Sequence, residues 1–130
     1  MQLELARSIL FAKSMAEMVG FYRDLLGLVE VTTADTSDEW RVFRAGPVEL
    51  ALHAIPAPFA DGIEISDPPE PRSSAVTKLV FRVADVAETR ALLQKKGVIE
   101  VHQSFLNAEG PLVRCDFLDP EGNVFQISSE

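Results

Sequence analysis

Hydrophobic and polar residues recur along the chain in an order that appears twice. The stretch from Arg7 to Val31 is RSILFAKSMAEMVGFYRDLLGLVEV, and the stretch from Lys78 to Val101 is KLVFRVADVAETRALLQKKGVIEV. Each contains a basic residue, an apolar strand-like run, a polar cap, a run with helical spacing, a glycine and a second strand-like run. The shared order predicts two copies of one structural module.

Each copy carries signals for the start and the end of a helix. Ser14 and Asp85 can accept hydrogen bonds from the first helical turn, and a glutamate follows each of them, as in a capping box. Apolar residues then recur at helical spacing until Gly27 or Gly97 ends the run. The positions at this spacing are Met15, Met18, Val19, Tyr22, Leu25 and Leu26 in the first helix and Val86, Thr89, Leu92 and Leu93 in the second.

Strand-like runs rich in β-branched residues follow each helix. They cover residues 28–33, 40–44 and 48–55 in the first half, and 98–102, 112–118 and 123–128 in the second. Turn signals, Ala45-Gly46-Pro47 and the run from Asp119 to Gly122, separate the last two strands of each half. Each half is therefore predicted to be a β-α-β-β-β module within one α+β domain.

The predicted modules cover residues 1–55 and 76–130, with a connector at 56–75. Residues 56–72, PAPFADGIEISDPPEPR, hold five of the eight prolines and four acidic residues. That composition is typical of a stiff, exposed connection. A connection of this length can also cover a binding site, and the sequence leaves that alternative open.

Composition and charge narrow the class of protein. The 130 residues are 47% hydrophobic and 25% charged, as in one globular domain. The net charge of −8 disfavours nucleic-acid binding, because phosphate backbones repel an acidic surface. The start, MQLELARSIL, lacks a signal-peptide pattern, and no apolar run is long enough to span a membrane. Cys115 is the single cysteine, so no internal disulfide can form and we expect a cytoplasmic protein. Because Cys115 lies in an apolar strand, its thiol is expected to be buried and inert.

Three local patterns occur in order within this plan. Residues 21–28, FYRDLLGL, end the first helix, Val48-Glu49-Leu50 opens the fourth strand, and residues 117–127, FLDPEGNVFQI, form the last hairpin. Together they resemble the vicinal oxygen chelate superfamily, which includes glyoxalases, extradiol dioxygenases, fosfomycin-resistance enzymes and bleomycin-resistance proteins. The resemblance implies that each βαβββ module forms a curved mixed sheet, that the two sheets form a cup, and that the chain is a homodimer.

In metal-dependent members of that superfamily, four positions on the first and fourth strands of the modules hold a divalent ion. The resemblance places Arg7, Glu49, Lys78 and Gln126 at these positions. Only Glu49 is a usual ligand, because arginine and lysine are cationic and glutamine offers a weak neutral oxygen. We therefore expect no metal and no cofactor, which argues against the superfamily's metal-dependent enzyme chemistry. Alternatively, Glu49 pairs with Arg7 or Lys78, and this ion pair fills the position that the metal ion occupies in metal-dependent members.

Strand alternation extends this set, since every second residue shares a face. His53 then lies with Glu49, Phe11 with Arg7, and Arg82 with Lys78. Cations on apolar walls suit an organic anion, with Phe11 or Trp40 against its apolar part. For Trp40, packing at a strand start is the favoured interpretation, and His53 is a weak candidate for acid–base catalysis. The candidate ligand-binding residues are Arg7, Phe11, Trp40, Glu49, His53, Lys78, Arg82 and Gln126.

The expected function is metal-independent binding of a small organic molecule, with an anionic one preferred, and Lys78→Met is expected to abolish it. One alternative is a glyoxalase- or dioxygenase-like enzyme with an atypical or absent metal site, using His53 and Glu49 for proton transfer. A second is a drug-sequestering protein of the bleomycin-resistance type, although a basic cup argues against a cationic drug. A third is a regulatory or structural dimer whose cup is filled. Binding to nucleic acid or to a membrane is not expected.

Overall fold

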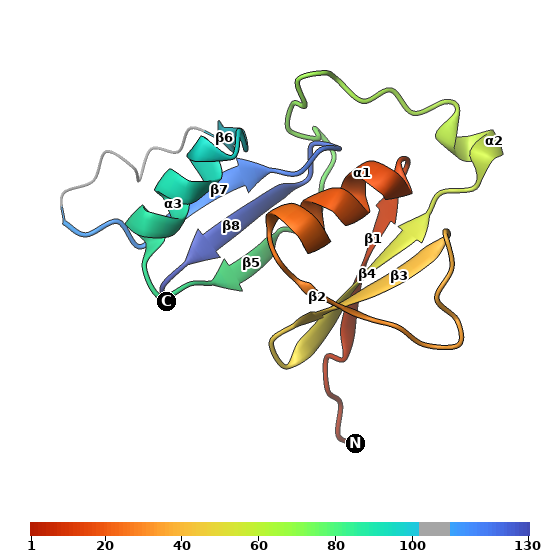
Figure 1. Ribbon diagram of the computed structural model, residues 1–130, viewed down its shortest axis with the longest axis horizontal. Coiled ribbons are helices and arrows are strands. Elements are labelled where there is room, and N and C mark those ends of the chain that lie inside the picture. Colours follow the sequence, from red (N-terminus) through yellow and green to blue (C-terminus); the bar gives the residue numbers. More distant parts are fainter. Residues whose placement is uncertain (102–109) are drawn as a thin grey trace. The chain divides into compact units, whose positions relative to one another are not determined.

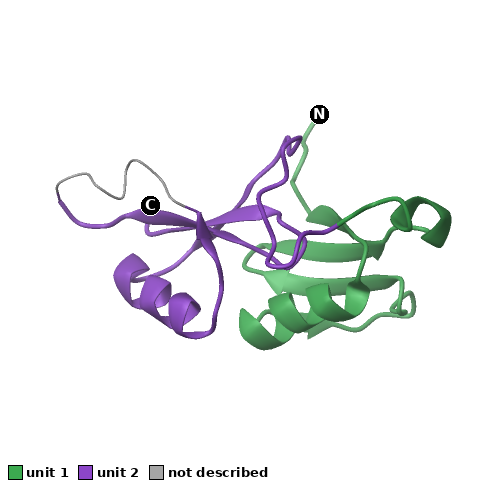
Figure 2. Ribbon diagram, turned by 90° about the horizontal axis from the view of Figure 1, so that it is seen from above, with its two compact units in different colours: residues 1–64 green, residues 65–130 purple. Residues whose placement is uncertain are grey.

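The computed structural model describes residues 1–101 and 110–130, which form two units, Met1–Glu64 and Ile65–Glu130 (Figure 2). Each unit contains one four-stranded mixed sheet with helical segments, which confirms the α+β class and the repeated βαβββ plan. Among the described residues, no helix is both long and apolar enough to cross a membrane.

Unit 1 carries the first module (Figure 1). Its sheet has the strand order β1-β4-β3-β2, with β1 parallel to β4 and the other neighbours antiparallel. Its elements are β1 (Arg7–Ala12), α1 (Met15–Val19), the π-helix η1 (Gly20–Leu25), β2 (Val29–Val31), β3 (Trp40–Ala45), β4 (Val48–Ala54) and α2 (Ala57–Ala60).

Unit 2 repeats this topology with the strand order β5-β8-β7-β6, in which β5 is parallel to β8. Its elements are β5 (Leu79–Arg82), α3 (Val86–Lys95), β6 (Glu100–Val101), β7 (Arg114–Leu118) and β8 (Val124–Ser128). The predicted strand 98–102 is therefore shorter than expected within the described part, and His102 lies outside the described residues.

The predicted helix caps are confirmed in both units. The Ser14 hydroxyl accepts a hydrogen bond from the Glu17 backbone N–H at 3.4 Å. The Asp85 carboxylate accepts one from the Glu88 backbone N–H at 2.9 Å. At the other ends, Gly27 and Gly97 have φ angles of 79° and 80°, a left-handed conformation that glycine adopts without strain.

The first helix differs from the continuous α-helix that the sequence predicts. After α1 the backbone widens into η1, where the Leu26 N–H bonds to the Phe21 carbonyl at 2.8 Å. The wider turn lets two consecutive rings, Phe21 and Tyr22, both be buried, in edge-to-face contact at 5.1 Å. In α3, Val86 and Leu93 are buried and carry the packing, whereas Leu92 is 49% exposed.

The core of each unit lies between its helix and one face of its sheet. In unit 1, Leu50 and Leu52 are buried on the face beneath α1, as alternation along β4 predicts. In unit 2, Phe117 and Phe125 stack at 6.0 Å, and Cys115 is fully buried. Burial raises the pKa of the Cys115 thiol, which confirms the expected buried cysteine.

The turn between β7 and β8 is built from the predicted Asp119–Asn123 sequence. The Asp119 carboxylate accepts hydrogen bonds from the backbone N–H of Glu121 and from the backbone and side chain of Asn123. Gly122 has a φ of 82°, and a Cβ there would overlap the backbone oxygen of Glu70. Arg72 also bonds to this turn, so part of the predicted connector packs on unit 2.

Candidate functional site

The sheet register brings five of the predicted ligand-binding residues onto one face of unit 1. In the β1–β4 pair, Arg7 lies beside Glu49 and Phe11 lies beside His53. In the β3–β4 pair, Trp40 lies beside His53. Because paired residues share a face and side chains alternate, these residues lie opposite Leu50 and Leu52. This surface, the Arg7 face, comprises Arg7, Ile9, Phe11, Trp40, Val42, Arg44, Glu49, Ala51 and His53.

One end of the Arg7 face is a row of rings that crosses three strands. The His53 ring lies 5.7 Å from the Phe11 ring and 5.5 Å from the Trp40 ring, the latter edge to face. Phe11 is 60% exposed, and Ile9 on the same strand is 44% exposed. The row therefore presents apolar surface outward instead of closing it into the core of unit 1.

The other end of the Arg7 face is charged. A guanidinium nitrogen of Arg7 lies 2.7 Å from a carboxylate oxygen of Glu49, and both side chains keep about a third or more of their surface exposed. The same guanidinium lies 5.5 Å from the centroid of the Trp40 ring, a cation–π distance. Arg44 is the register partner of Glu49 on β3. Arg7 thus links the charged end of the face to its aromatic end.

The matching surface of unit 2 contains a residue that the sequence analysis missed. The Lys78 ammonium lies 2.9 Å from one carboxylate oxygen of Asp116, and the Gln126 amide donates to the other at 2.8 Å. Asp116 is only 1% exposed. A signal was available, because Asp116 is the one charged residue within the apolar run Cys115–Leu118. A lone acid in such a run requires partners from neighbouring strands.

The structure also identifies the bonding partners of Glu49, Lys78 and Arg82. Of the two cations predicted as partners for Glu49, Arg7 forms the pair, while Lys78 bonds to Asp116. Arg82 donates from Nε to the backbone oxygen of Glu130 at 3.3 Å. His53 follows Glu49 by four residues on β4, so about 13 Å of strand separates them. That spacing argues against transfer of one proton between these two residues.

The residues at the four predicted metal positions do not fit a divalent ion. In unit 1, the Glu49 carboxylate is already neutralised by the Arg7 guanidinium. In unit 2, Lys78 presents an ammonium, and Gln126 uses its amide N–H on Asp116. Within residues 1–101 and 110–130, no group of three or more His, Cys, Asp or Glu side chains could hold a metal ion. The donor chemistry of these positions suits ion pairing instead.

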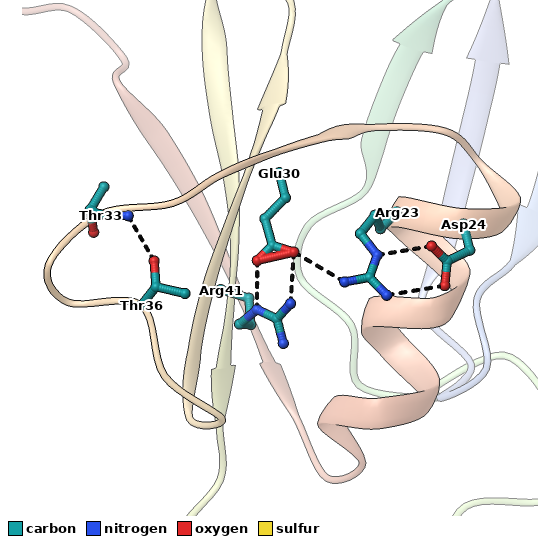
Figure 3. A network of polar contacts seen from close by, with 6 residues as sticks. All are labelled: Arg23, Asp24, Glu30, Thr33, Thr36 and Arg41. Atoms are coloured by element: carbon teal, nitrogen blue, oxygen red, sulfur yellow. Dashed lines mark hydrogen bonds and ion pairs between the residues drawn. The ribbon is translucent and has the colours of Figure 1, made fainter.

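A second polar network supports the sheet of unit 1 (Figure 3). Arg41 on β3 donates two hydrogen bonds of 2.7 Å to Glu30 on β2, and Arg23 on η1 donates to Glu30 at 3.2 Å. The Arg41 hydrogen bonds are the main cause of a lowered pKa at Glu30. The network ties the edge strand β2 to the helix, so it positions β3 and with it Trp40.

Comparisons with known proteins agree on the fold. The family model for the Glyoxalase/Bleomycin resistance protein/Dioxygenase superfamily matches residues 4–127. A comparison with curated proteins finds no match. Similar solved structures include a lactoylglutathione lyase from Agrobacterium tumefaciens, with 22% identity, coverage of 96% of this chain and 92% of that one, and a TM-score of 0.66.

Two further structures have the same fold. A glyoxalase/dioxygenase from Nostoc punctiforme is 19% identical over 95% of this chain and 88% of its own, with a TM-score of 0.69. A genomically encoded fosfomycin resistance protein from Listeria monocytogenes is 15% identical over 100% and 93%, also with a TM-score of 0.69. At these identities the likeness extends to the fold and not to the activity.

Proposed function

The chain belongs to the glyoxalase/bleomycin resistance protein/dioxygenase superfamily, and from this premise we propose that the Arg7 face of unit 1 binds a small organic anion without a metal ion. The observation that carries the proposal is the meeting of the exposed Arg7 guanidinium with a row of rings that ends in the exposed ring of Phe11. Among the described residues, the Arg7 side chain donates one hydrogen bond, to Glu49, and Phe11 is 60% exposed on the same sheet face. Apolar walls with a few polar anchors are typical of small-molecule sites.

The charges of this face favour an anion. Arg7 and Arg44 flank a single carboxylate, Glu49, along one row of the sheet. The whole chain carries a net charge of −8, but salt screens exposed charges beyond about 8 Å at physiological ionic strength. A carboxylate on the ligand can therefore accept charge-assisted hydrogen bonds from Arg7, which has several N–H donors.

The names of two similar structures also support a small ligand. One is a lactoylglutathione lyase, and the other is a fosfomycin resistance protein. Each name refers to a small organic molecule, so this fold is used in connection with such compounds. Since their identity to this chain is 22% and 15%, neither compound is itself proposed as the ligand here.

Trp40 provides a direct test, because it is the single tryptophan of the chain and lies on the proposed face. Purified protein in EDTA is titrated with a panel of aliphatic carboxylates and with the amides and amines of the same skeletons. We expect the carboxylates alone to change Trp40 fluorescence in a saturable way. Saturable binding of the amines instead would favour a drug-sequestering protein, and a response that requires added metal would contradict the metal-free proposal.

The matched variants for this titration are Arg7→Gln and Lys95→Gln. Loss of a charge-assisted hydrogen bond is worth about 1.5–3 kcal/mol, so Arg7→Gln is expected to weaken carboxylate binding about tenfold or more. Lys95 lies at the end of α3 in unit 2 and is not a residue of the Arg7 face, and its neutralisation changes the net charge equally. Lys78→Met is a less direct test than expected, because Lys78 also partners the buried Asp116.

One alternative has its own supporting observation. The 2.7 Å contact between Arg7 and Glu49 matches the idea that an ion pair fills the position of a former metal ligand. In that case no carboxylate binds, and Arg7→Gln changes nothing that the fluorescence titration measures. The same titration therefore distinguishes a filled site from a binding site.

A further inference from the structure

We infer that the ligand of the Arg7 face is a flat aromatic carboxylate, an inference that rests on the function proposed above and narrows its ligand class. The starting point is the ring row, in which Phe11, His53 and Trp40 occupy paired positions on three neighbouring strands. Neighbouring strands lie about 4.8 Å apart, so the three rings form a continuous strip across the sheet. The strip ends at the exposed ring of Phe11.

The rings of this strip offer both edges and faces. His53 is tilted by 34° against Phe11 and stands nearly perpendicular to Trp40, at 84°. Aromatic pairs prefer offset-stacked and edge-to-face arrangements, because their faces are electron-rich and their edges are electron-poor. A ligand ring can add to the strip in the same way, whereas a saturated ring gains only apolar contact.

The position of Arg7 sets the distance between the ligand's ring and its charge. The guanidinium carbon lies 5.5 Å from the Trp40 ring, although three residues of β1 lie between Arg7 and Phe11. Arg7 therefore leans toward the aromatic strip. A ligand that lies on the strip meets the guanidinium within one ring's width, which fits a carboxylate attached directly to an aromatic ring.

Exposed apolar surface continues from the strip along β1. Ile9 lies between Phe11 and Arg7 on the same face of that strand and is 44% exposed. Val42 and Ala51, the register partners in the middle row of the face, are buried and offer no surface to a ligand. A ligand ring beside Phe11 can therefore extend over Ile9 toward the Arg7 guanidinium.

The decisive comparison uses three probes with one skeleton: 2-naphthoate, the fully saturated decahydro-2-naphthoate, and 2-naphthamide. Affinities are measured by isothermal titration calorimetry, because 2-naphthoate absorbs where Trp40 is excited. We expect 2-naphthoate to bind at least about tenfold more tightly than either of the other two. Equal affinity for the saturated carboxylate would overturn the aromatic inference but leave the proposed anion binding intact, whereas no binding of either carboxylate would sink both.

Two phenylalanines of unit 1 provide a matched pair of variants. Phe11→Leu keeps an apolar side chain on the strip but removes its ring, and Phe59→Leu makes the same change on α2, where Phe59 is 72% exposed. An aromatic contact is worth a factor of about three to ten in affinity. We expect that loss for 2-naphthoate with Phe11→Leu and no loss with Phe59→Leu.

Phe11→Leu also separates a ligand site from an interface between copies of the chain. Sedimentation analysis is run on the wild type and on both variants at the concentrations used for calorimetry. An unchanged oligomeric state with reduced 2-naphthoate affinity supports the inference. A change in oligomeric state with unaltered 2-naphthoate affinity would assign Phe11 to contact with a second copy and would overturn it.

Discussion

Each unit has an ion pair at the start of its first strand, but the two pairs are buried to different degrees. Arg7 begins β1 and bonds to Glu49 on the neighbouring strand β4. Lys78 immediately precedes β5 and bonds to Asp116 on β7, which β8 separates from β5. In unit 1 the Glu49 side chain keeps 33% of its surface exposed, whereas in unit 2 the Asp116 side chain keeps 1%. The acid of unit 2 therefore lies on the strand that matches β3, one strand further from the cation's strand than in unit 1.

This difference separates a contact that can change partners from one that is fixed. An exposed ion pair contributes about 0–1 kcal/mol, so a ligand anion can replace Glu49 at Arg7 at little cost. A buried carboxylate that loses its cation is left uncompensated, which is strongly unfavourable. The Arg7 pair is therefore suited to binding, and the Lys78 pair is suited to holding β5, β7 and β8 together.

The turns of the two units show the same contrast. Gly46, between β3 and β4, has a φ of 70°, and nothing lies near a Cβ built on it. Gly122, in the corresponding turn of unit 2, also has a positive φ, but the Glu70 backbone lies directly against it. Unit 2 thus encloses the acid of its ion pair and the glycine of its last turn, whereas unit 1 leaves the corresponding acid and glycine open to solvent.

The largest expected effect comes from Gly122→Ala. The new methyl group combines backbone strain with overlap on the Glu70 backbone, for a destabilisation of about 3–4 kcal/mol. Gly46→Ala, with strain alone, is expected to cost about 1 kcal/mol. Urea denaturation followed by circular dichroism measures both. Equal losses in the two variants would contradict the contrast between the turns.

A smaller effect is expected from Lys78→Met, which removes the Lys78 ammonium from the buried Asp116 carboxylate. The expected loss of unfolding free energy is about 2–3 kcal/mol, reduced because Lys78 is itself partly exposed. The matched variant Arg7→Met should cost less than about 1 kcal/mol. Adding Asp116→Asn to Lys78→Met should recover part of the loss, and failure to do so would argue against an uncompensated charge.

The smallest effect concerns a feature that the two units share. Glu30 and Glu100 occupy matching places in GLVEV and GVIEV, and each accepts hydrogen bonds from an arginine of its helix, Arg23 or Arg90. Because the pKa of Glu30 is lowered in the folded chain, its contribution is present above its ordinary pKa and is lost as pH falls through the folded value.

Glu30→Gln is therefore expected to cost about 1 kcal/mol at pH 7 and progressively less below about pH 4.5. Denaturation curves of the wild type and the variant between pH 3 and pH 7 measure this difference. A gap between the two proteins that is constant with pH would show that the charge of Glu30 does not contribute.

The predictable parts of the fold are those set by local sequence. Helix starts and ends depend on contacts within one helical turn, so single residues predict them. These residues are the caps Ser14 and Asp85 and the glycines Gly27 and Gly97. Strand alternation likewise predicted that Leu50 and Leu52 pack beneath the helix. These signals depend on backbone geometry that the residue itself decides.

The features that sequence analysis missed depend on neighbours that are distant in the chain. Asp116 acquires its partners from Lys78, just before β5, and from Gln126 on β8, 38 and 10 residues away, and nothing local selects them. The choice of Arg7 over Lys78 as the partner of Glu49 follows from the parallel register of β1 and β4. The widening of the first helix into η1 follows from packing two rings, where helical spacing alone predicts a regular α-helix.

The buried thiol of Cys115 has a practical consequence. Its surface is fully covered, and its raised pKa keeps the nucleophilic thiolate scarce near neutral pH. Since it is also the only cysteine in the chain, a second cysteine introduced at an exposed site would be modified selectively by maleimide reagents. Spectroscopic probes can therefore be attached to the native protein at chosen places without first removing a residue from its interior.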